Sequence, residues 1–200
     1  MGRNSADVSR TVRWLRPWVG GRRQPASPTS RHGTDRETPT ADPELTFRTS
    51  ATSARHLRAL TERTGALVVG RRLFDITSGW GGRHPLDVPV VVVTHRVPEG
   101  WEPKNDSFVF VTDGIESAIA RAKAIAGDKE VGVNGGTIAA QVVEAGLLDE
   151  VHVELVPVLL GAGVPLFADL KIAPLQLDGP FSVVEGDGVT HLAYRVRRAA

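Results

Sequence analysis

Residues 130–143 read EVGVNGGTIAAQVV and join a predicted strand to a predicted helix through two glycines. Glycine has no Cβ, so the main chain at Gly135 and Gly136 can approach a ligand closely. The free N–H groups and the positive dipole end of the helix attract negative charge. The stretch therefore favours a site for a dinucleotide pyrophosphate, although glycine also occurs at such turns for steric reasons alone.

Strands and helices alternate on both sides of this stretch. The sequence predicts helices at 53–64, 70–75, 113–127 and 137–145, and strands at 66–69, 88–94, 108–111, 131–133 and 151–156. Asp113 and Glu116 are placed to form a capping box at the third helix. Two further strands, at 181–184 and 190–196, flank a turn-rich link and predict a β-hairpin. This order predicts an α/β fold with a mixed, mostly parallel sheet and helices on both faces.

The 200 residues fit one domain, and 41% apolar and 24% charged residues are ordinary for a globular protein. Residues 1–43 differ, because Arg, Pro, Ser, Thr and Gly dominate there. We predict a disordered or atypical basic segment at 1–43 and the folded domain at 44–200. The Arg/Trp stretch at 13–23 is either a contact for an anionic surface or a solvated tail.

Charge and composition exclude several functions. Residues 1–42 hold eight arginines against four acids while the whole chain has a net charge of +1, so the remainder is mildly acidic and we expect no nucleic-acid partner. The chain has no cysteine, which excludes disulfides, thiolate metal sites and cysteine nucleophiles. No apolar run approaches the roughly 18 residues that span a bilayer, and the N-terminus lacks a signal-type apolar core. We therefore expect a cytoplasmic protein without a membrane partner.

One group of polar residues raises the question of a metal site. His152 and Glu154 point the same way from one predicted strand, and His191 lies on a later one. A His/Glu metal site is conceivable from that alternation. Because the sequence shows no third nearby ligand, we interpret these histidines as hydrogen-bonded strand residues and predict no metal site.

Six segments in a fixed order carry a resemblance to a known family: VGRRLFD at 69–75, VVTHR at 92–96, VTDGIE at 111–116, VNGGTIA at 133–139, GLLDE at 146–150 and PVLLGAG at 157–163. Together they resemble the riboflavin-biosynthesis reductase C-terminal-domain branch of the dihydrofolate reductase-like family. The resemblance implies a three-layer fold around an eight-stranded mixed sheet, usually as a homodimer. It also implies hydride transfer from NADPH to a small heterocyclic or imine-like substrate, which in this branch is a phosphoribosylaminouracil.

The resemblance also implies which residues bind NADPH. Gly70 and Arg71 follow one strand and Thr94 to Arg96 follow the next, so both groups lie on the carboxyl-end rim of the sheet, where ligands bind. Arg71 and Arg96 would hold the adenosine end and its 2′-phosphate, since a guanidinium can fork two hydrogen bonds onto a phosphate. Alternatively, each is an exposed loop charge. The full predicted set is Gly70, Arg71, Thr94, His95, Arg96, Asn134, Gly135, Gly136, Thr137, Ile138, Leu160 and Gly161.

Two parts of this prediction remain open. The loop with Leu160 and Gly161 resembles the family loop beside the nicotinamide, but it also fits a flexible turn. Family members begin with a central strand and a polar turn, and only residues 44–48 alternate suitably here. We therefore assign no catalytic residue. An impaired nucleotide-binding or structural relative that lacks the first central strand is the alternative.

Overall fold

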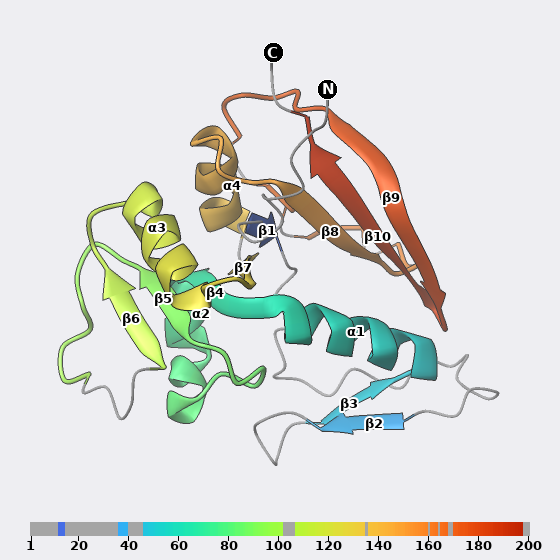
Figure 1. Cartoon of the computed structure of the whole chain (residues 1–200), viewed down its shortest axis with the longest axis horizontal. Coiled ribbons are helices and arrows are strands. Elements are labelled where there is room, and N and C mark those ends of the chain that lie inside the picture. The colour runs from blue at the N-terminus through green and yellow to red at the C-terminus, as the bar shows by residue number, and fades with distance from the viewer. Residues whose placement is uncertain are drawn as a thin grey trace.

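The structure is a computed structural model that describes residues 12–14, 36–39, 46–101, 107–134, 136–159, 161–163, 165–167 and 170–197. Its strands are β1 (Val12–Trp14), β2 (Arg36–Pro39), β3 (Thr46–Thr49), β4 (Thr64–Gly70), β5 (Val90–Val93), β6 (Phe108–Val111), β7 (Glu130–Asn134), β8 (Glu150–Leu155), β9 (Leu177–Gly186) and β10 (Val189–Val196). Its helices are α1 (Ala51–Arg63), α2 (Arg71–Ile76), the short 3-10 helix η2 (Ser78–Gly82), α3 (Ile115–Ala126) and α4 (Gly136–Glu144). Figure 1 shows their arrangement.

Eight strands form one mixed sheet in the order β6-β5-β4-β7-β1-β8-β10-β9. Every pairing from β6 to β8 is parallel, and β10 pairs antiparallel with both β8 and β9. The C-terminal hairpin therefore forms one edge of a sheet that is otherwise parallel. This confirms the predicted fold class, including the mostly parallel sheet and the hairpin. Strands β2 and β3 form a separate antiparallel pair.

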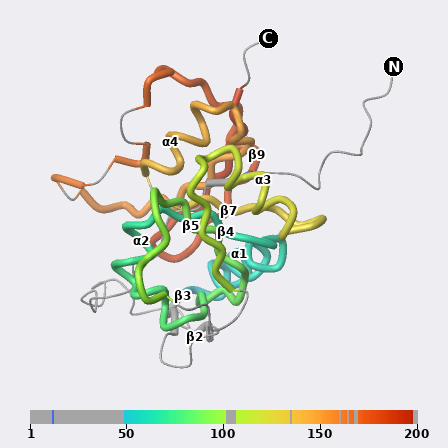
Figure 2. The backbone as a smooth tube through the Cα atoms, turned by 90° about the vertical axis from the view of Figure 1, so that its left-hand side faces the viewer, coloured from blue at the N-terminus to red at the C-terminus, as the bar shows by residue number. Residues whose placement is uncertain are grey.

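The direction of each crossover sets which face a helix covers. The connections through α1 and α2 step along the sheet in one direction, and those through α3 and α4 step in the other. Because such crossovers are right-handed, the two pairs of helices lie on opposite faces. In agreement, α3 and α4 pack with one cluster of buried residues and Phe74 of α2 packs with the other. Helix α4 is uppermost in Figures 1 and 2.

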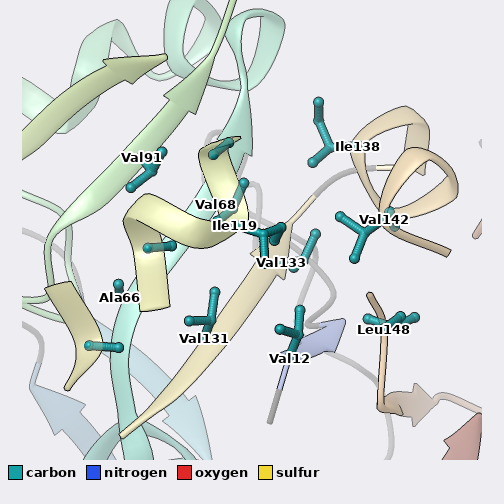
Figure 3. Packing of buried hydrophobic residues seen from close by; sticks show 14 of the residues in the cluster. Val12, Ala66, Val68, Val91, Ile119, Val131, Val133, Ile138, Val142 and Leu148 are labelled. Carbon is teal, nitrogen blue, oxygen red and sulfur yellow. The ribbon is translucent and has the colours of Figure 1, made fainter. Parts of the chain in front are cut away.

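The core consists mainly of valines on the central strands. Side chains of β4 and β5 alternate between the two faces, as the pleat of a strand requires. Figure 3 shows Val12 between Val131 and Leu148, within the larger cluster. Val12 is fully buried. Strands β4 and β5 are buried on both sides, which explains their almost uninterrupted apolar sequences.

A strand occupies the central position of the sheet, for which residues 44–48 were the only candidate in the sequence. It is β1, which pairs with β7 on one side and β8 on the other. The backbone N–H of Val12 donates to Oδ2 of Asp149 at 2.9 Å, and its carbonyl accepts from the N–H of Asp149 at 3.0 Å. Residues 12–14 therefore belong to the sheet and not to a tail. The domain boundary near residue 43 stays a prediction, since most of that segment lies outside the described residues.

The start of α3 differs from the predicted capping box. Its N-cap is Gly114, with φ 108°, and no side chain caps the helix. A backbone conformation with that φ favours glycine and moves Asp113 out of the capping position. The glycine therefore determines where the helix begins.

Among the described residues, no helix has both the length and the apolar character to cross a membrane.

Candidate functional site

The predicted cofactor residues lie along one rim of the sheet, where the parallel strands end. Gly70 ends β4, Thr94 directly follows β5, and Asn134 ends β7. Strand β4 pairs with both β5 and β7, so the three positions lie on adjacent strands. Helices α2 and α4 start immediately after Gly70 and Gly135, so the structure places both helix N-termini on this rim.

Hydrogen bonds join the two predicted phosphate-binding arginines. Nη1 of Arg71 donates to the carbonyl of Arg96 at 3.1 Å, and Oγ1 of Thr94 donates to the same carbonyl at 2.8 Å. Nε of Arg71 donates to Oδ1 of Asp75, one turn later, at 2.7 Å. The Arg71 guanidinium is partly exposed, and Arg96 and His95 are exposed. The structure thus brings Arg71 and Arg96 together on the outer surface of the rim, and the buried Thr94 hydrogen-bonds to the Arg96 main chain.

Asn134 supplies a buried polar atom without a partner. Its side chain is 7% exposed, and its Oδ1 accepts no hydrogen bond within the described part of the chain. A buried polar atom of this kind is rare in a folded protein and calls for an explanation. Its position beside the start of α4 provides one, because a ligand with a hydrogen-bond donor would satisfy the oxygen.

Gly70 and Ile138 bring β4 and α4 into close contact. A Cβ at Gly70 would lie 3.0 Å from Cγ1 of Ile138. Glycine at this position therefore allows β4 and α4 to pack closely. It would also allow the backbone to approach a ligand, as predicted. Ile138 is buried, Gly136 is half-buried, and Thr137 is exposed.

These residues fit a phosphorylated dinucleotide. Phosphates are complementary to the two guanidinium groups and to the two helix N-termini, which have no acidic residues in their first turns. A ring with a hydrogen-bond donor is complementary to the unpaired amide oxygen of Asn134. The predicted residues Gly135 and Leu160 lie outside the described residues. Gly161 is exposed, with φ 74°, and a Cβ there would contact nothing within 4 Å. Among the described residues, no contact joins Gly161 to the rim.

A second polar cluster lies farther along the same rim, at the end of β8. Glu154 of β8 and His191 of β10 are direct cross-strand partners, and α1 adds His56 and Ser53. His152 takes no part, because its Nε2 lies 3.1 Å from Oε2 of Glu150. Sequence alternation identified Glu154 and His191 but missed His56 and Ser53, which reach the strands only when α1 packs on the sheet. The spacing of Ser53 and His56 on one helix face was the available signal.

Two hollows lie outside the arginine rim. One, of about 280 Å³, is lined by Arg83, His84, Asp87, Val88, Pro89 and Ser107, at the opposite end of β5. Burial lowers the pKa of His84 there from its ordinary 6.5 to about 4. The other, of about 500 Å³, lies between the end of β8 and the β9–β10 hairpin, beside the second cluster, and its lining includes Leu155, Gly186 and Thr190.

The chain is similar to known proteins over most of its length. A family described as the RibD C-terminal domain matches residues 27–186. A putative riboflavin biosynthesis protein from Shewanella sp. PV-4 is 22% identical with a TM-score of 0.58, over 94% of this chain and 99% of that chain. Two forms of Acinetobacter baumannii RibD are 13% and 14% identical, with TM-scores of 0.56 and 0.55, over 96% of this chain and 59% of that chain. These structural likenesses establish the fold, and the chain spans about three fifths of that RibD. No curated protein matches the sequence significantly.

Proposed function

Because the chain belongs to the family of the RibD C-terminal domain, a reductase-type family, we propose that it is an NADPH-dependent reductase acting on a small heterocyclic or imine-like substrate. The observation that carries this proposal is the rim that gathers Arg71, Thr94 and Arg96 beside Asn134. The family resemblance favours a phosphoribosylaminouracil as the substrate, and two structural relatives are described as a putative riboflavin biosynthesis protein and as RibD.

The residues divide the binding of NADPH between them. Arg71 and Arg96 bind the 2′-phosphate, which distinguishes NADPH from NADH, and Thr94 orients the Arg96 main chain through its hydrogen bond to the carbonyl. The N-terminus of α4 faces the pyrophosphate. Asn134 accepts a hydrogen bond from the ligand through its Oδ1. The bound cofactor supplies the hydride, and the protein positions it and excludes water.

The alternative, a nucleotide-binding relative without turnover, presupposed the loss of the first central strand. Strand β1 occupies that position in the structure. This observation favours a functional reductase over the alternative. We further propose, on the family resemblance, that the protein is a cytoplasmic homodimer; sedimentation velocity of the full chain tests the oligomeric state.

Two measurements test the proposed activity. Titration of intrinsic Trp fluorescence with NADPH and NADH measures binding, and the loss of NADPH absorbance with a panel of pterin, flavin and pyrimidine acceptors measures turnover. We expect binding that favours NADPH and oxidation with at least one acceptor. Binding without any turnover would support the alternative. Failure to bind either cofactor would exclude both functions.

A further inference from the structure

We infer that His56, Glu154 and His191 form a binding site for a divalent transition-metal ion of the zinc class. Their ligand atoms lie within 4.8 Å of one another. The inference is separate from the proposed reductase activity, because none of the three residues belongs to the predicted NADPH-binding set.

Three elements position the cluster. His191 and Glu154 are directly opposed on the antiparallel strands β10 and β8, so their side chains project from the same face of the sheet. Helix α1 covers that face and contributes His56. The tip of the β9–β10 hairpin lies beside the start of α1 in Figure 1, where the N–H of Asp187 donates to Oγ of Ser50 at 3.5 Å. The site is therefore formed between the sheet and α1 by residues that are far apart in the sequence.

The donor set suits zinc. Two imidazoles and one carboxylate are the three protein ligands of many catalytic zinc sites. In a tetrahedral site with metal–ligand distances of about 2.1 Å, the ligand atoms are roughly 3.4 Å apart. Nε2 of His56 and Oε1 of Glu154 are 3.9 Å apart, and the other carboxylate oxygen lies against Nδ1 of His191. The chain has no cysteine, so a stronger thiolate site is absent.

The hydrogen bonding of His191 leaves one ring nitrogen for a metal. Its Nε2 is 2.9 Å from Oγ of Ser53, while its Nδ1 is buried and makes no hydrogen bond of normal geometry in the described part of the chain. When Nε2 donates to Ser53, the lone pair of Nδ1 faces the Glu154 carboxylate. A cation bound by both groups removes the repulsion between that lone pair and the carboxylate. Hydrogen bonding of the distal nitrogen is the usual way in which a protein orients a histidine ligand.

The surroundings keep this geometry fixed. Ser50 Oγ donates to Ser53 Oγ at 3.2 Å, so the serine that holds His191 is itself held at the start of α1. A Cβ at Gly186 would contact Ser53 and would lie 3.3 Å from Nε2 of His191. The rings of His56 and His191 are 4.3 Å apart between centroids and tilted by 30°. Only glycine at position 186 therefore leaves room for Ser53 and His191 to meet.

A competing interpretation uses Ser53, His191 and Glu154 as a serine, histidine and acid relay. Two observations favour the metal. Ser53 is 3% exposed and is therefore poorly placed to attack a substrate, whereas His56, which a relay does not need, adjoins the carboxylate. Three protein ligands leave a fourth position for water or a ligand oxygen. The 500 Å³ hollow at the end of β8 is lined by Leu155 and Thr190, the chain neighbours of Glu154 and His191.

The test measures zinc binding by the tag-free full chain after removal of metals by chelation. Competition with a chromophoric chelator gives the Zn²⁺ affinity, and the visible spectrum of Co²⁺ reports the coordination number. We expect one Zn²⁺ per chain and a four-coordinate Co²⁺ spectrum. His56→Ala and Glu154→Gln should each weaken Zn²⁺ binding by about a hundredfold or more, and Ser53→Ala by about tenfold. His152→Gln, on the same strand, is the matched control and should retain the affinity.

Circular dichroism of each variant separates loss of a ligand from loss of folding. Stoichiometric binding that disappears in folded His56→Ala and Glu154→Gln supports the site. The inference is overturned if the wild-type chain binds no Zn²⁺, or if folded variants bind it as the wild type does. Labelling of Ser53 by a fluorophosphonate, without metal binding, would establish the relay in its place. None of these readouts depends on NADPH.

Discussion

Arg71 and Arg96 illustrate how neighbouring contacts prepare a charged side chain for a ligand. Arg71 donates to Asp75 through Nε and to the Arg96 carbonyl through Nη1. These bonds already restrict its rotamers, so less side-chain entropy is lost when a ligand binds. The same carbonyl accepts from Thr94. The rim therefore presents the Arg71 guanidinium in a largely preorganised position.

Arg71→Ala and Arg96→Ala should each weaken NADPH binding by about 1.5–3 kcal/mol, because a charged hydrogen bond to phosphate is lost. NADH has no 2′-phosphate, so its affinity should change much less. Fluorescence titrations with both cofactors measure the difference. Arg72→Ala, at the exposed neighbouring position, is the control. Equal losses for the two cofactors would contradict the assignment of the 2′-phosphate.

Asn134→Leu should separate binding from stability. The buried Oδ1 has no partner, and an unsatisfied group of this kind costs about 1–3 kcal/mol. An apolar side chain of similar size removes that cost, so the free energy of unfolding should stay the same or rise, while NADPH affinity falls. Urea denaturation and cofactor titration measure the two effects. A large loss of stability would mean that Asn134 has a structural role instead.

The segment from η2 to β5 contains a histidine that is buried among apolar and aromatic side chains. His84 is 7% exposed and its ring lies edge-on to Trp80 at 4.6 Å. Its Nδ1 accepts from the N–H of Leu86 at 3.2 Å. Desolvation lowers the pKa of this imidazole to about 4, so it is neutral in the folded protein at ordinary pH.

The depressed pKa of His84 predicts a loss of stability in mild acid. The unfolded chain takes up a proton at this residue below about pH 6.5, whereas the folded chain does so only below about pH 4. The free energy of unfolding should therefore fall as the pH is lowered through that window, by at most about 3 kcal/mol. His84→Asn retains an acceptor for the Leu86 N–H and should flatten this dependence. Denaturation at a series of pH values tests it, and an unchanged pH profile in the variant would rule His84 out as the cause.

Elements with strong local patterns were predictable from sequence, and those defined by distant partners were not. Strands β4, β5 and β6 contain continuous apolar runs, and Gly127 caps the end of α3. The glycine stop expected at Gly65 is different, because Thr64 is the C-cap of α1 and Gly65 already belongs to β4. Strand β1 is only Val-Arg-Trp in a basic segment, and it is a strand because β7 and β8 provide partners on both sides. His56 was missed for the same reason, since a helix residue joins Glu154 and His191 only after the layers have packed.

The whole molecule depends on β1, which joins the parallel strands to β8 and the hairpin. Val12→Thr places a hydroxyl group in a fully buried apolar position and should lower the free energy of unfolding by about 1–3 kcal/mol. Val183→Thr, on β9 with 53% exposure, should change it by less than about 0.5 kcal/mol. Urea denaturation compares the two. Equal effects would mean that residues 12–14 are not part of the core in solution.

Family membership was predictable, since six ordered segments carry the resemblance and the match over residues 27–186 confirms it. The substrate was not, because the polar turn expected after the first strand has no counterpart in the sequence.

The central placement of β1 has a consequence for synthesis on the ribosome. Val12 is synthesised 137 positions before its hydrogen-bond partner Asp149. Until β7 and β8 have been synthesised, β1 has no sheet partner on either side, and its backbone N–H and C=O groups are open to other polypeptides. The eight-stranded sheet therefore closes only after β8 and the hairpin have been made, and this topology makes the nascent chain a natural client for chaperones.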